Sequence, residues 1–178
     1  MENPKPTAAL LSSCLLCLGF AAQPALADDD SELKAKLEGV QEVPSVITGA
    51  SGRFKAELNE SSGMIEWELR YEGLEGGNVL QAHIHVGQRG VNGGIVVFLC
   101  SNLPSPPAGT QACPPPPAHI SGTITAANVL PQLSQGVSAG EFSALVRALK
   151  KGVAYANVHT AVSPGGEIRG QIRVRDDD

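Results

Sequence analysis

Residues 53–71, RFKAELNESSGMIEWELRY, decide the fold class. Apolar side chains occupy every second position on both sides of a short polar segment: Phe54, Ala56 and Leu58 before it, and Ile65, Trp67, Leu69 and Tyr71 after it. This period of two is typical of antiparallel strands with one buried and one solvated face. Residues 59–63 carry the polar side chains and the glycine of a hairpin turn. The stretch therefore predicts a β-hairpin.

Similar strand patterns extend over the rest of the chain. They cover residues 33–38, 79–86, 94–100, 118–125, 153–160 and 167–175. Residues 94–100 are apolar almost throughout, which is typical of a central strand. Helical spacing occurs only in residues 140–151, and a shorter turn is predicted within residues 126–133. Seven or eight short strands without a βαβ rhythm predict an all-β antiparallel sandwich with a short helical insertion.

The N-terminal residues have the pattern of a targeting segment. Lys5 precedes an apolar run, and Ala25-Leu26-Ala27 offers the small residues that signal peptidase requires. We expect a Sec-type signal peptide over residues 1–27 and a single mature domain over residues 28–178, secreted or periplasmic. A lipobox ending at Cys14 is the alternative. The apolar run is too short to span a bilayer, so no membrane span is expected in the mature chain.

Charge and cysteine content indicate which partners are disfavoured and how the cysteines pair. The 178-residue chain has a formal net charge of −5, and its well-mixed charges argue against a nucleic-acid partner. Two of the four cysteines, Cys14 and Cys17, lie in the signal segment. The remaining pair, Cys100 and Cys113, flank a loop rich in proline and are expected to form a disulfide in an exported protein. The alternative is that the two thiolates bind copper.

Four histidines are the candidate functional residues. His83 and His85 are two positions apart in a predicted strand, so both imidazoles project from the same face. Two such rings on a stiff backbone form half of a metal site, or they are simply solvated or bonded to carbonyls. The chain offers only two further imidazoles, His119 and His159.

Several motifs, in order along the chain, give it a resemblance to the CHRD (chordin-type) domain family, in a single-domain bacterial-type form. The motifs are Gln41-Glu42-Val43-Pro44, Thr48-Gly49-Ala50-Ser51-Gly52, Ala82-His83-Ile84-His85-Val86-Gly87, Gly90-Val91-Asn92-Gly93, Gly122-Thr123-Ile124-Thr125, Asn157-Val158-His159-Thr160 and Pro164-Gly165-Gly166-Glu167-Ile168-Arg169-Gly170. The resemblance implies a Greek-key, immunoglobulin-like sandwich that is distantly similar to copper/zinc superoxide dismutase. No activity is generally accepted for the family, and a fold alone does not assign one.

The similarity to superoxide dismutase implies which histidines would bind a metal. His83 and His85 map onto a His-x-His pair of copper ligands and His159 onto a ligand late in the chain, with His119 as a fourth candidate. Imidazole suits copper and zinc. Three further residues are expected to orient the rings: Gln81, Asn157 and Glu167. The alternative is structural, with the histidines orienting turns and Glu167 forming a surface ion pair with Arg169.

These observations favour a binding or structural module over an enzyme. The first hypothesis is a copper or zinc site formed by the histidine cluster. A copper-dependent dismutase is the second, with Arg89 or Arg169 as the guanidinium that steers superoxide. Four histidines are too few for the bimetallic enzyme, so no catalytic residue is assigned. A domain that binds an extracytoplasmic protein is the third.

Overall fold

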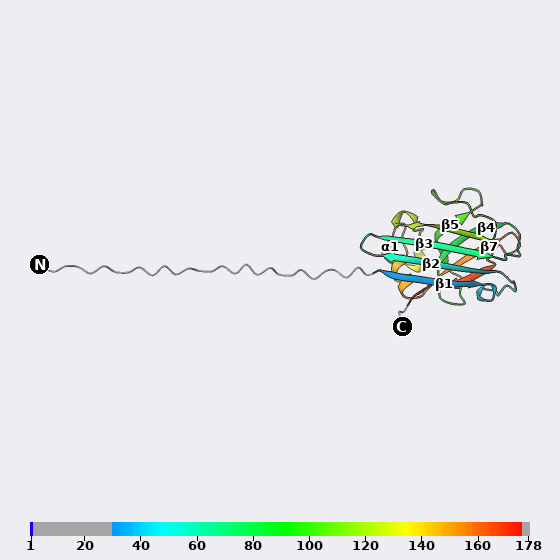
Figure 1. Cartoon of the computed structure of the whole chain (residues 1–178), viewed down its shortest axis with the longest axis horizontal. Coiled ribbons are helices and arrows are strands. Elements are labelled where there is room, and N and C mark those ends of the chain that lie inside the picture. The colour runs from blue at the N-terminus through cyan, green and yellow to red at the C-terminus, as the bar shows by residue number, and fades with distance from the viewer. Residues whose placement is uncertain (2–29, 176–178) are drawn as a thin grey trace.

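The computed structural model describes residue 1 and residues 30–175, and the predicted signal peptide lies almost wholly outside them. Nine strands, one α-helix and three short 3-10 helices make up the described part (Figure 1). The strands are β1 (Ser31–Glu38), β2 (Ser51–Asn59), β3 (Met64–Glu72), β4 (Val79–Val86), β5 (Gly94–Ser101), β6 (Ala118–Ile124), β7 (Ala154–Thr160), β8 (Ile168–Gln171) and β9 (Arg173–Val174). The helices are α1 (Phe142–Lys150), η1 (Gly39–Gln41), η2 (Ala126–Asn128) and η3 (Leu133–Gln135).

All pairings between these strands are antiparallel, and the strands follow the order β5-β4-β7-β8-β1-β2-β3-β6. A single register pair, Glu38 with Arg169, joins the β5-β4-β7-β8 half to the β1-β2-β3-β6 half. Apolar side chains from both halves form one core between them. The fold is therefore an all-β sandwich with a small helical insertion, as the sequence predicts.

The hairpin that decides the fold has the predicted register. Phe54 lies opposite Leu69 and Ala56 opposite Trp67, and these side chains are buried. Arg53 and Lys55 alternate with them on the outer face, which is solvated. Alternation in the sequence thus becomes one apolar face and one charged face of the first half of the sandwich.

The last predicted strand, residues 167–175, is two strands in the structure. β8 pairs with β7, and β9 pairs with β1. Between them the chain leaves one half of the sandwich for the other, with Ile172 fully buried at the crossing. A period-two pattern does not reveal this change of partner, because side-chain alternation continues through it.

Helix α1 buries five residues against the core: Ala144, Leu145, Val146, Ala148 and Leu149. It ends just before Gly152, which takes a left-handed backbone conformation with φ of 65°. Within the described residues, no helix combines the length and hydropathy needed to cross a bilayer.

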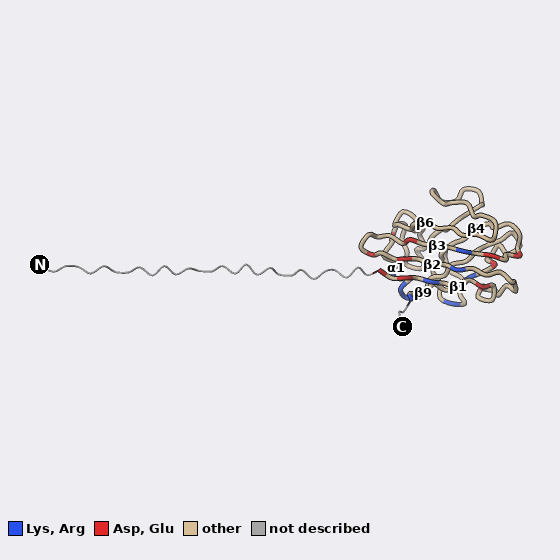
Figure 2. Tube along the Cα trace, in the orientation of Figure 1, with Lys and Arg blue, Asp and Glu red and all other residues tan. Residues whose placement is uncertain are grey.

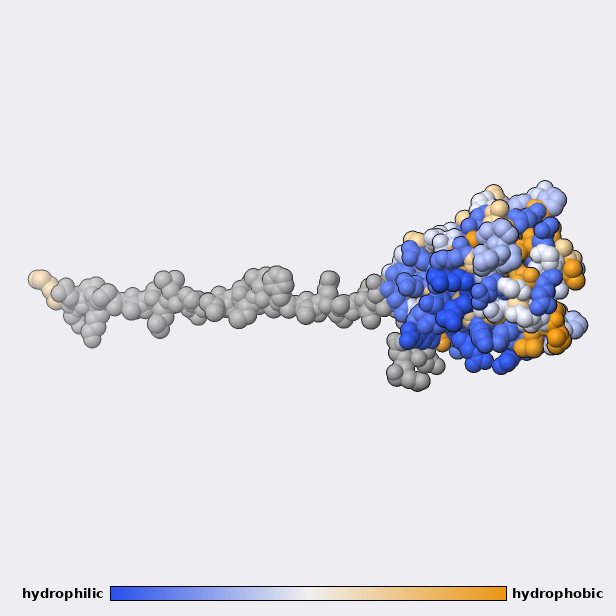
Figure 3. All heavy atoms as spheres, turned by 45° about the vertical axis from the view of Figure 1, so that its right-hand side comes forward, coloured by the Kyte–Doolittle hydropathy of each residue, from blue (hydrophilic) through white to orange (hydrophobic). Residues whose placement is uncertain are grey.

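The outer face of β4, β7 and β8 differs from that of the first half, because loops cover it. Residues 42–49, 87–93 and 161–167 supply the contacts from these loops. Gly93 permits one close approach, since a Cβ there would lie 1.6 Å from the Val86 carbonyl oxygen. Four apolar side chains in η1 and in these loops are exposed: Val40, Ile47, Val91 and Val162. Figure 3 shows hydrophobic surface gathered toward one end of the domain.

Cys100 and Cys113 form the predicted disulfide, with an S–S distance of 2.06 Å. Asn102 reinforces the closure, because its side-chain amide donates to the carbonyls of Val79 and Cys113 and accepts from the Cys113 N–H. The bridge pins a proline-rich loop against the end of β5.

We expect the Cys100→Ala/Cys113→Ala variant to lose about 3 kcal/mol of unfolding free energy, because an open loop has more freedom in the unfolded chain. Urea unfolding of the variant and of wild type, with and without reductant, measures the difference. Reductant should weaken wild type to the level of the variant and leave the variant unchanged. A reductant effect on the variant would contradict the assignment.

Candidate metal centre

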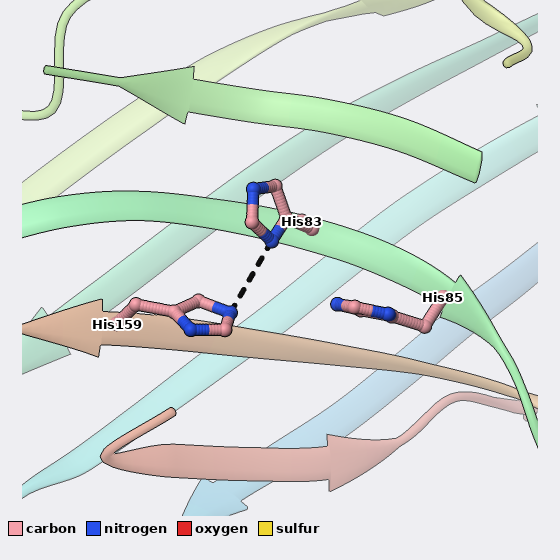
Figure 4. A group of neighbouring side chains, drawn as sticks. All are labelled: His83, His85 and His159. Atoms are coloured by element: carbon pink, nitrogen blue, oxygen red, sulfur yellow. Dashed lines mark hydrogen bonds between the residues drawn. The ribbon is translucent and has the colours of Figure 1, made fainter. Parts of the chain in front are cut away.

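His83, His85 and His159 lie together on the loop-covered face. β4 carries the first two and β7 the third, and these strands are hydrogen-bonded neighbours in which Gln81 pairs with His159 and His83 with Asn157. The three rings point toward one another (Figure 4). One nitrogen from each ring lies within 4.8 Å of the others, and all three residues are buried.

Backbone carbonyls orient two of the rings. Nδ1 of His85 lies 2.9 Å from the Gly93 oxygen, and Nδ1 of His159 lies 2.9 Å from the Pro164 oxygen. A carbonyl oxygen only accepts, so both Nδ1 atoms carry the proton and both Nε2 atoms keep a free lone pair. Nε2 of His85 is buried without a hydrogen-bond partner among the described residues. Two lone pairs are therefore fixed in direction by the surrounding loops.

The His83 ring completes the cluster. Its Nδ1 lies 3.2 Å from Nε2 of His159 and donates to that lone pair. Its Nε2 is buried without a partner in the described part of the chain, and the ring packs edge-on against Phe98 with centroids 4.4 Å apart. Buried polar atoms are normally hydrogen-bonded, so two unpartnered imidazole nitrogens in one cluster need an explanation.

Burial keeps the three imidazoles neutral. Desolvation, reinforced by its two histidine neighbours, lowers the pKa of His83 to about 2. Desolvation also lowers the pKa of His85, to about 4, although its bond to Gly93 opposes the change. The pKa of His159 is lowered for the same reason. Neutral imidazole is the form that binds a transition metal.

An aromatic and cationic stack supports the His85 ring. Tyr155 lies parallel to it, with centroids 4.7 Å apart, and the Arg169 guanidinium lies 3.4 Å from the Tyr155 centroid. Arg169 is 1% exposed and donates to Gln88, Val91 and Asn92 in the covering loop. Arg169 thus holds the loop over the site.

The alternative of a surface ion pair between Glu167 and Arg169 is wrong. Glu167 is also 1% exposed, and its carboxylate accepts bonds from the hydroxyls of Thr48 and Thr160. It accepts further bonds from the backbone N–H groups of Glu75 and Gly76. Burial alone would raise the pKa of Glu167, but these four donors together lower it. Glu167 thus links the loops that contain Thr48 and Gly76 to Thr160, the residue after His159.

The fold places the remaining predicted site residues in different parts of the domain. Gln81 is half-buried beside His159 in the sheet register, and Asn157 is buried between His83 and Arg169. His119 is on β6 in the other half of the sandwich, exposed and 2.9 Å from Glu68. Arg89 is exposed in the loop after β4. The fold therefore brings together three histidines and leaves His119 out.

Glu42 is a buried residue at this site to which the sequence analysis gave no role. It is 5% exposed, and its Oε1 is buried without a partner among the described residues. Burial raises its pKa to about 7, against the opposing effects of the Arg169 charge and the Asn157 amide. The Gln41-Glu42-Val43-Pro44 motif marked Glu42 as a residue of interest. The neighbouring sequence, however, does not predict that η1 and the following loop fold over the histidines.

The donor set fits a borderline or soft transition-metal ion. Nitrogens that bind one tetrahedral ion at ~2 Å lie ~3.3 Å apart, and the His83–His159 separation of 3.2 Å is close to this value. A third nitrogen within 4.8 Å needs only a small inward movement. Three imidazoles without a carboxylate suit copper or zinc and do not suit calcium or magnesium.

The buried ionisable groups predict a pH dependence for the metal-free protein. As the pH falls below 6.5, the unfolded chain protonates these three histidines more readily than the folded protein does, so stability falls with acidification. Glu42 acts in the opposite direction between about pH 7 and 4.5, because its folded form binds the proton more tightly. We expect a net loss on going from pH 7 to 5, at up to about 1.4 kcal/mol per pH unit for each net proton.

Urea unfolding with a chelator at pH 7, 6 and 5 tests this dependence. The Glu42→Gln variant should lose stability more steeply than wild type, because the opposing contribution is gone. The exposed Glu66→Gln change on β3 is the matched control and should follow wild type. A wild-type protein that becomes more stable on acidification, or a Glu42→Gln slope equal to that of the control, would contradict the expectation.

Comparisons with known proteins complete the description. The family model described as the CHRD domain matches residues 33–172, which is most of the sequence. Searches of curated proteins and of solved structures gave no significant match. The matched range includes all three clustered histidines, Glu42 and Arg169. The chain belongs to the CHRD-domain family.

Proposed function

We propose that this CHRD module is exported and binds copper or zinc through Nδ1 of His83, Nε2 of His85 and Nε2 of His159. A CHRD domain is an extracellular-type binding or structural module, and we propose that a metal ion is what this one binds. The observation that carries the proposal is the convergence of three buried, neutral imidazoles whose ligand atoms lie within 4.8 Å.

The unpartnered nitrogen atoms of the cluster support the proposal. A buried acceptor without a partner is destabilising by about 1–3 kcal/mol. Nε2 of His85 is in that situation, although a carbonyl fixes its ring firmly. A metal ion would use this lone pair and that of His159 together. A purely structural role for the histidines explains the carbonyl bonds but does not explain the unpartnered nitrogen.

Binding requires one rearrangement within the protein. In the metal-free state Nδ1 of His83 holds a proton and donates it to His159. For Nδ1 to serve as a ligand, this proton must be carried by Nε2, which is buried. His85 and His159 keep their tautomers, because the Gly93 and Pro164 carbonyls hold their Nδ1 protons. The tautomers of two ligands are thus set in advance, whereas His83 changes its tautomer and nitrogens as much as 4.8 Å apart must move closer to bind one ion.

Three protein ligands would leave one coordination position on a tetrahedral ion, where bound copper or zinc would supply Lewis-acid chemistry and bound copper would also exchange an electron. The residues around that position limit access to it. Arg169 is held by three loop acceptors and by the Tyr155 ring, so it shields the site and does not face solvent. This arrangement favours a binding role over a dismutase.

Export to the periplasm or beyond the cell is supported by two observations. The Cys100–Cys113 disulfide is stable in an oxidising compartment. The sequence of residues 1–27 has the features of a Sec-type signal peptide.

Isothermal titration of chelator-treated protein with Zn²⁺ and with Cu²⁺ tests the metal site. We expect His85→Gln and His159→Gln each to weaken binding at least about 100-fold, because each removes a ligand. The exposed His119→Gln variant is the matched control and should bind like wild type. Metal at about 100 times its Kd should also stabilise wild type by about 2.7 kcal/mol.

Electron paramagnetic resonance of the Cu²⁺-loaded wild type gives a test that does not depend on a variant folding. Coupling to three imidazole nitrogens is the expected result. Equal affinities for His85→Gln and His119→Gln, or a folded wild type that binds neither ion, would contradict the proposal and leave the structural role.

A further inference from the structure

The solvated face of the first half of the sandwich carries a row of basic residues. Lys36 on β1 lies opposite Arg53 on β2, Arg53 opposite Arg70 on β3, and Arg70 opposite His119 on β6. All four side chains are exposed. We call these four residues the cationic row. It crosses four neighbouring strands at right angles to their direction, and Figure 2 shows the basic positions on adjacent strands.

The neighbouring rows show that the charges on this face are sorted. Next to the cationic row, Lys34 lies opposite Lys55, with Glu68 as the acidic residue beside them. The row after that is acidic, and its members are Glu32, Glu57 and Glu66. Hydrophilic residues cover a broad, continuous area in Figure 3. On the other side of the cationic row lie Glu38, Ser51 and Glu72. In a chain of net charge −5, the basic positions thus form a stripe between two acidic rows.

Such a row is unfavourable for folding alone. Like charges directly opposite each other on neighbouring strands destabilise a sheet. Ion pairs offset part of this repulsion, because Lys36 pairs with Glu38 and Glu68 is shared by Lys55, Arg70 and His119 at 3.8, 3.3 and 2.9 Å. Arg53, in the middle of the row, has no ion pair with any residue that the structure describes. The row therefore points to an anionic partner.

We infer that this face binds a linear acidic polysaccharide, with its sulfate or carboxylate groups along the cationic row. Neighbouring strands are ~4.8 Å apart, so Lys36, Arg53 and Arg70 offer three positive charges over ~10 Å, and the His119 imidazole lies one strand further. An open hollow of about 580 Å³ follows it, lined by Arg53, Arg70 and His119 among others. Ser51 and Ser121 flank the row and offer hydroxyl groups to sugar hydroxyls.

The same face is less suited to other anionic partners. Phe54, Trp67 and Tyr71 point into the core, so among its described residues this sheet exposes no Phe, Trp or Tyr ring on which a base would stack. No apolar side chain projects beside the row to enter a membrane. A second copy of the chain would meet a wholly charged surface, whereas stable interfaces are depleted in charge at their centre.

Binding of heparin and of alginate to the full mature protein tests the inference, with surface plasmon resonance at several salt concentrations. Arg53→Gln/Arg70→Gln should weaken both polysaccharides at least 10-fold at low salt. The salt dependence of log K should become shallower by about two, one unit for each lost cation. Arg89→Gln/Lys151→Gln removes the same charge outside the row and should bind like wild type.

Three results would overturn the inference. The first is an equal loss in the two double variants, which would show that only net charge matters. The second is tighter binding of single-stranded DNA or of phosphatidylserine vesicles than of either polysaccharide. The third is a dimer at low salt that Arg53→Gln/Arg70→Gln abolishes. An unfolding temperature of Arg53→Gln no lower than that of wild type is also expected, and a lower one would show that folding needs this cation.

Discussion

Each polar atom beneath the loops on the outer face of β4, β7 and β8 must find its partner within the protein. This constraint accounts for most of the contacts described there. Arg169 donates to three loop acceptors, and Glu167 accepts four bonds. Carbonyls hold the rings of His85 and His159. The atoms that remain unpartnered include Nε2 of His83 and of His85, in the cluster where a metal ion would use lone pairs.

The two outer faces of the sandwich arise from the same alternation of apolar and polar side chains, but one face is solvated and the other is covered by loops. On β1, β2 and β3 the outward side chains are solvated and charged. On β4, β7 and β8 the outward side chains are also polar, but loops remove them from water. Solvation lets the first face carry unpaired charge, whereas the second keeps its histidines neutral. One fold thus separates a surface for ionic contact from a sheltered site for coordination.

Local patterns in the sequence predicted the local structure. Alternation gave the strands, and the spacing of His83 and His85 gave their common face, because both depend only on neighbouring residues. The adjacency of β4 and β7 and the exclusion of His119 depend on pairing between distant segments. Glu42 could not be assigned for the same reason. The charges are mixed along the chain, but the register between strands sorts them into rows, which no single segment reveals.

The pairing of β9 with β1 has a consequence for how the domain is used. Leu33 lies opposite Val174, and the Arg175 N–H donates to the Glu32 carbonyl, so the chain enters and leaves the sandwich side by side. A tether or a neighbouring domain fused at either terminus would start from that shared edge.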